Sequence, residues 1–241
     1  MQTPADVRPS PIAGHWYTDD PHDLAESIDR YLTQATLPPL DGEVVAVIAP
    51  HAGHLYSGAV AGHAFAALRG MQAEVVAIIS PIHDYYPAAL LTTAHHAYET
   101  PLGTIPVDMD ALISLDERLE QMLGYRLAAL RRDREHSIEI ELPFLQRALA
   151  GQFKLLPVMM LEQSVRVAQS LGKALADILR GKQAILIAST DLSHQKPQQV
   201  ADMLDAEVLR CVGAFDPAGV IEAEEQGRGF ACGRGALAAV M

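Results

Sequence analysis

Three apolar runs of this chain each lead into a histidine. They read VVAVIAPH, VVAIISPIH and AILIASTDLSH, and they end in His51, His83 and His194. Imidazole nitrogens bind borderline transition metals well. A further ligand would come from Cys232, because the sequence ACGRG gives this thiol a flexible backbone that can approach a site closely. Together, His51, His83 and Cys232 predict a metal site.

Each of these residues also has an ordinary explanation when it is taken alone. A histidine after a strand can be a cap or a core residue, and a free cysteine is commonly a small buried side chain. The residues taken together favour the metal site. An alternative needs no metal: Cys232 would attack a substrate, with His51 or His194 as its base.

A carboxylate and an imidazole lie three residues apart after the third run. Asp191 and His194, in STDLSH, would share one turn and face one pocket. Histidine transfers protons near neutral pH, and a neighbouring carboxylate orients it. The pair is therefore a candidate acid–base site. The other interpretation makes Asp191 the N-cap of the next helix and leaves His194 in solvent.

The elements that must position these side chains are strands alternating with helices. The three runs are rich in Val, Ile and Leu, which is typical of strands buried on both faces, and KLLPVMM is similar. Ligand sites of open α/β sheets lie beyond the carboxyl ends of the strands, where these histidines fall. We predict an α/β fold with a central, largely parallel or mixed sheet flanked by helices. Predicted helices cover about 23–35, 57–70, 108–122, 136–150, 164–179, 198–213 and 216–225, and a pair of short strands lies within 87–107.

Length and composition limit the domain organisation and the partners. The 241 residues suit one large domain, which we place at 21–241, after a proline-rich segment 1–20 that we expect to lie extended on the surface. The net charge of −12 argues against nucleic-acid or anionic-membrane partners. No apolar stretch approaches the roughly 18 residues of a membrane span, and no secretory signal is recognisable. With only two cysteines in the chain, we expect a reducing, cytoplasmic setting.

Seven short motifs follow one another from about residue 9 onward: AGHWY, APHAGHLYSG, SPIHD, ETPLG, EHSIEIELPFLQ, STDLSH and CGRG. In this order they resemble the Memo-like family, whose prokaryotic members are called AmmeMemoRadiSam system protein B. The resemblance implies a fold like that of the class III, or LigB-type, extradiol ring-cleaving dioxygenases. Family members continue with a further strand beyond the last motif, so we expect this domain to lack a C-terminal strand.

The resemblance also implies a set of site residues. His51, His83 and Cys232 match the metal-binding positions, where the dioxygenases use two histidines and a carboxylate to hold non-haem Fe(II). Iron is therefore the first expectation, with copper and zinc left open by the thiolate. Asp191 and His194 match the pocket pair, with His194 as the acid–base histidine. The resemblance also favours a pocket role for His136, which otherwise reads as part of a solvated helix start.

The function that follows is metal-dependent redox or dioxygenase-like chemistry on a small molecule. Memo-like proteins have also been associated with scaffolding, so the alternative is a non-catalytic pocket for a peptide or small ligand. Homo-oligomerisation remains open.

Overall fold

A six-stranded mixed sheet forms the centre of the computed structural model, which describes residues 6–241. In spatial order its strands are β2 (Ala46–Ala49), β9 (Ala184–Ser189), β3 (Val75–Pro81), β8 (Lys154–Met160), β4 (Leu90–Thr93) and β7 (Ala128–Leu130). The first four are parallel, and β4 runs antiparallel to β8. The central strands β3 and β8 are almost fully buried, as their continuous apolar runs require. The predicted α/β fold with a mixed sheet is confirmed.

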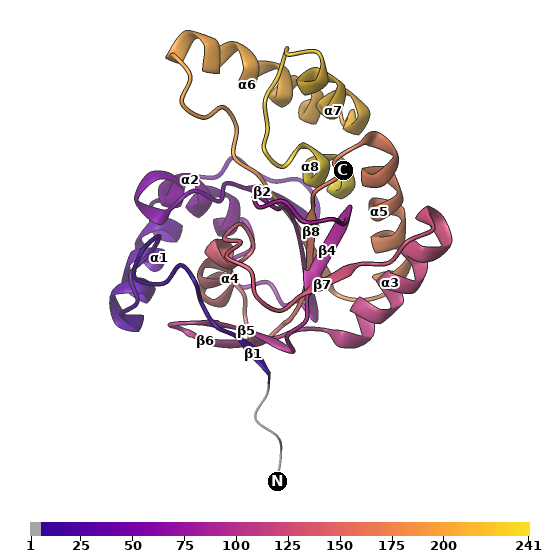
Figure 1. The fold of residues 1–241 in the computed structure, drawn as a ribbon. Helices are drawn as coiled ribbons and strands as arrows, with labels where there is room; N and C mark the ends of the chain where they lie inside the picture. The colour runs from indigo at the N-terminus through magenta and orange to yellow at the C-terminus, as the bar shows by residue number, and fades with distance from the viewer. Residues whose placement is uncertain (1–5) are drawn as a thin grey trace.

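Helices cover both faces of this sheet (Figure 1). One face carries α1, α2 and α4, and the other carries α3, α5 and α8, with α6 and α7 beyond α8. Capping residues explain where several of them begin: Asp20 accepts hydrogen bonds from the first turn of α1, and Ser164 does the same for α5. The bounds are α1 (Pro21–Gln34), α2 (His54–Ala66), α3 (Met109–Leu123), the 3-10 turn η1 (Glu139–Glu141), α4 (Leu142–Ala148), α5 (Val165–Ile178), α6 (Gln198–Gly213), α7 (Pro217–Glu225) and α8 (Arg234–Val240).

A second, three-stranded sheet packs at one end of the molecule. It consists of β1 (Val7–Arg8), β5 (Ala97–Thr100) and β6 (Gly103–Pro106), in the order β1-β5-β6. The prediction of two short strands within 87–107 was incomplete, because β4 joins the main sheet and only β5 and β6 form a hairpin. Residues 1–5 of the predicted N-terminal segment lie outside the described residues, and the division of the chain at residue 20 stays a prediction.

The first apolar run differs from its prediction. Strand β2 is an edge strand, so Val45 beside it is 59% exposed and Ile48 is 39% exposed, although the run was expected to be buried on both faces. Strand β9 lies between β2 and β3, so consecutive strands along the chain are not neighbours in the sheet. A single sequence does not encode this order locally, because crossover connections set it. Among residues 6–241, no helix is both long and apolar enough to cross a membrane.

Candidate metal and thiol site

Strand register brings the predicted residues of β2 and β9 together. Ala49 pairs with Ser189 at the carboxyl ends of these parallel strands. His51 and Asp191 each follow two residues later, and the backbone N–H of His51 donates a hydrogen bond to Asp191 Oδ1 at 2.9 Å. Two residues that are 140 positions apart in the chain therefore meet at one edge of the sheet.

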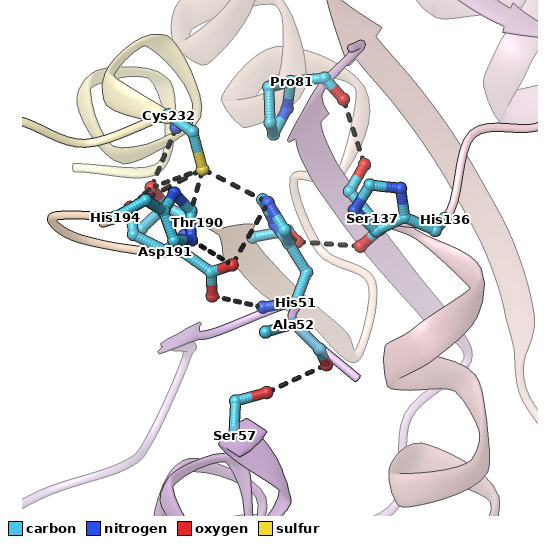
Figure 2. A network of polar contacts seen from close by, with 12 residues as sticks. His51, Ala52, Ser57, Pro81, His136, Ser137, Thr190, Asp191, His194 and Cys232 are labelled. Atoms are coloured by element: carbon cyan, nitrogen blue, oxygen red, sulfur yellow. Dashed lines mark hydrogen bonds and ion pairs between the residues drawn. The ribbon is translucent and has the colours of Figure 1, made fainter. Parts of the chain in front are cut away.

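Cys232 reaches the same edge from the loop before α8 (Figure 2). Its Sγ lies 3.2 Å from His51 Nε2 and accepts a hydrogen bond from the backbone N–H of Asp191 at 3.1 Å. The next residue must be small, because a Cβ on Gly233 would stand 2.3 Å from the carbonyl oxygen of Ser189. The glycines of CGRG thus permit the close backbone approach that the sequence suggested.

Three imidazoles meet beside the thiol. The donor atoms of His51, His83 and His136 all lie within 4.8 Å of one another, which is close enough for all three to face one ion. The rings of His83 and His136 are stacked, with centroids 4.6 Å apart. His194 is not part of this group, so the third run supplies Asp191 to the centre while its histidine lies further out. Another His and carboxylate group lies at the start of α1, and all three of its residues are exposed; it comprises His22, Asp23 and Glu26.

In two of these imidazoles, His51 and His83, one ring nitrogen is held by the protein. His51 Nδ1 lies 2.9 Å from Ser189 Oγ, which in turn donates to the carbonyl of Ser137. His83 Nδ1 lies 3.0 Å from the carboxylate of Glu135. In both rings this leaves Nε2 available to a ligand, as in protein metal sites where a neighbouring acceptor fixes the ring.

The site stabilises a thiolate. Burial raises the pKa of Cys232, but hydrogen bonds from His51 and His83 outweigh it and bring the pKa to about 6. The same contact with Cys232, supported by Glu135, raises the pKa of His83 to about 10. His136 differs, because burial lowers its pKa to about 4 and keeps the ring neutral at pH 7. The site therefore offers a deprotonated sulfur and, in His136, a neutral imidazole, while His83 Nε2 would release its proton when it binds an ion.

Asp191 and His194 form the predicted pair. His194 Nε2 lies 3.1 Å from Asp191 Oδ2, and the histidine side chain is 51% exposed, so it lies between the site and solvent. The alternative role of Asp191 as a helix cap is wrong, because α6 begins later, with Pro197 at its N-cap position.

Trp16 lies against the histidine group, although the sequence favours an aromatic anchor for the N-terminal segment over a pocket wall. Its ring packs on His136 with centroids 4.0 Å apart, and its carbonyl oxygen accepts a hydrogen bond from the backbone of His54. The motif AGHWY contained the residue, and its proximity to His136 depends on the fold of the N-terminal segment over η1. No local spacing in the sequence encodes that contact.

The fold and the site define an α/β protein with a histidine and cysteine centre at the carboxyl ends of its parallel strands. A family model described as Memo-like protein matches residues 8–241. A MEMO1 family protein of Methanopyrus kandleri is 33% identical over 240 residues, covering 95% of this chain and 84% of the relative. A MEMO1 family protein of Methanosarcina mazei is 31% identical, covering 98% of this chain and 85% of the relative. The chain belongs to the Memo-like family.

Proposed function

We propose that this protein holds a transition-metal ion between His51, His83 and Cys232 and uses it in redox chemistry on a small molecule. The observation that supports this proposal is the meeting of a thiol and two imidazoles, each imidazole with one nitrogen already engaged by the protein. Iron is the first choice, and copper and zinc also suit two nitrogen donors and one sulfur donor.

The residues present fit such an ion. The sulfur lies 3.2 Å from His51 Nε2 and contacts His83, so small side-chain movements bring the donors onto one centre. A half-buried thiolate beside imidazoles is the donor set that soft and borderline metals select. A bound redox metal would supply electron transfer and polarisation of a substrate oxygen.

The other pocket residues have roles that follow from their positions. His194, half exposed and hydrogen-bonded to Asp191, is placed to move a proton between the pocket mouth and a bound molecule. Asp191 orients that ring through Oδ2 and holds the His51 backbone through Oδ1. His136 is a neutral imidazole covered by Trp16, so it can accept a hydrogen bond from a ligand hydroxyl while Trp16 excludes water from that side.

Metal content after anaerobic Fe(II) loading tests the binding step. We expect about one iron per chain in the wild type and in Cys211→Ser, which removes the other, buried thiol. We expect a marked loss in Cys232→Ser. Negligible iron, copper and zinc in the wild type would remove the proposal.

A catechol panel under oxygen tests the chemistry. Ring cleavage that is lost in His194→Gln supports the redox proposal. Saturable catechol or peptide binding without turnover would instead favour a non-catalytic binding pocket.

A second candidate function is nucleophilic catalysis by Cys232 without a metal. The 3.2 Å contact between Sγ and His51 Nε2 and the low thiol pKa favour it, since a thiolate beside an imidazole is an activated nucleophile. An activated ester should then leave an acyl group on Cys232, detectable by mass spectrometry of the metal-free protein. Absence of acylation together with slow iodoacetamide labelling at neutral pH would exclude it.

We also propose a reducing, cytoplasmic setting, supported by the two unpaired cysteines. The proposed partner is a small molecule or peptide, with no nucleic acid or membrane.

A further inference from the structure

Glu135 is buried where the chain approaches η1, and its carboxylate accepts hydrogen bonds from two consecutive residues and from both the backbone and the ring of one distant histidine. Oε1 accepts from the backbone N–H groups of His136 at 2.9 Å and Ser137 at 3.0 Å. Oε2 accepts from the backbone N–H of His83 at 2.6 Å. The His83 ring closes the set, with Nδ1 3.0 Å from Oε1 and 3.2 Å from Oε2.

We infer that Glu135 is the positioning residue that fixes the orientation of the His83 ring and keeps the proton on its Nδ1; in its effect on metal affinity this inference rests on the proposed function. An ionised carboxylate only accepts hydrogen bonds, so the His83 nitrogen facing it must carry a proton. Nδ1 therefore keeps its hydrogen, and Nε2 is the nitrogen left to face Cys232 and an ion.

His83 needs this support more than His51 does. The His51 side chain is 1% exposed and is fixed by its surroundings, whereas the His83 side chain is 41% exposed. A half-exposed ring loses rotational freedom when it ligates an ion, and a partner that fixes it beforehand removes much of that entropic cost. The backbone bond from His83 to the same carboxylate also fixes the loop that carries the ring.

Glu135 is itself anchored by a buried cation. Arg8 donates to the Glu135 carbonyl oxygen at 2.8 Å and to the carboxylate of Glu139 at 2.7 Å. Burial alone would raise the pKa of Glu135, but the His83 ring and the backbone N–H groups hold it below its usual range, so the carboxylate is ionised at neutral pH. The orientation of His83 is thus tied to a rigid segment rather than to a mobile side chain.

The two imidazoles differ in the partner behind them. His51 Nδ1 meets a neutral hydroxyl, while His83 Nδ1 meets a carboxylate. A carboxylate partner increases the basicity of the ligating nitrogen more than a hydroxyl does. Glu135→Gln should therefore weaken metal binding through His83 specifically. The amide of the introduced glutamine has one acceptor oxygen, and it places an NH₂ group against at least one of the N–H donors.

The experiment compares Glu135→Gln with Glu139→Gln in the full-length protein. Glu139 is a matched control because it is buried in the same segment and contacts Arg8, Ser10 and Tyr17. The readouts are the Zn(II) dissociation constant and the ¹⁵N NMR signals of the His83 ring in the metal-free and Zn(II)-loaded protein. We expect Glu135→Gln to lose about ten- to hundredfold in affinity and to lose the exchange-protected Nδ1 proton of His83. Glu139→Gln should change neither.

Unchanged affinity and unchanged His83 signals in a folded Glu135→Gln protein would overturn the inference, as would an equal loss in both variants. If Glu135→Gln does not fold, Glu135→Asp provides the test, because it keeps the charge but shortens the side chain. A weakened but detectable Nδ1 hydrogen bond in Glu135→Asp supports the inference, and an unaltered one overturns it. If wild-type protein binds no metal, the proposed function fails, while the NMR signals of the metal-free protein still decide the role of Glu135.

Discussion

Replacing Arg8 by Met should destabilise the protein strongly, because it removes the cation from a buried charge cluster. The guanidinium is 4% exposed and lies 2.5 Å from Asp133 and 2.7 Å from Glu139, whose side chains are 3% and 0% exposed. Removing one partner of a buried ion pair typically costs about 3–5 kcal/mol, since the remaining charge stays desolvated. We expect a loss in that range, which is a large part of the 5–15 kcal/mol typical of a whole domain.

The loss should also depend on pH. Burial already raises the pKa of Glu139 although Arg8 is present, and without Arg8 it should rise further. The folded variant would then bind more protons than its unfolded chain, so its stability falls as pH increases. The cost of Arg8→Met should therefore be larger at pH 8 than at pH 5.

Urea unfolding followed by circular dichroism at both pH values measures this effect. Arg147→Met is the matched control, because Arg147 pairs with Asp29 at 2.6 Å while both side chains are more than 40% exposed. Exposed pairs contribute about 0–1 kcal/mol. If Arg8→Met costs no more than Arg147→Met, or if its cost does not change with pH, the account of this buried cluster is wrong.

Three further predictions concern the pocket and its surroundings. In the metal-free protein, iodoacetamide should modify Cys232 with a rate that reaches half its maximum near pH 6, and a midpoint near 8.5 would contradict the thiolate assignment. Burial raises the pKa of Glu141 well above its usual value, so the wild-type protein should lose stability as the pH rises above about 4.5. Glu141→Gln lacks this titration, and its stability relative to wild type should increase by up to about 1.4 kcal/mol per pH unit in urea titrations. A difference that does not change with pH would refute this prediction. Cu(II) should quench the fluorescence of Trp16, the only tryptophan, because it packs on His136, and quenching that persists in His51→Ala would place the ion elsewhere.

Much of the fold was predictable because its elements carry local signals. The apolar runs of β3, β8 and β9 are found where they were predicted, and the helices predicted from 108 and 164 begin there, where Asp108 and Ser164 cap them. The order of the strands was not predictable, because the insertion of β9 between β2 and β3 depends on packing between distant segments. The same strand order places β2 at the edge of the sheet, which is why it is exposed.

The convergence of the site residues could be anticipated in part. Parallel strands end at a common edge, so His51, His83 and Asp191 had a physical reason to meet. The positions of Trp16 and of Glu135 beside His83 depend on contacts between segments far apart in the chain, which period and spacing do not encode.

The contact between Cys232 and His51 spans 181 positions, and it forms only once α8 docks on the sheet. During synthesis the imidazoles emerge long before the sulfur does, and domains fold as units once their last element is present. Under the proposed function, an ion cannot template the early steps of folding with its full donor set. Loading with the full donor set must come after Cys232 has been synthesised and α8 has docked, so tight metal binding would report that this contact has formed.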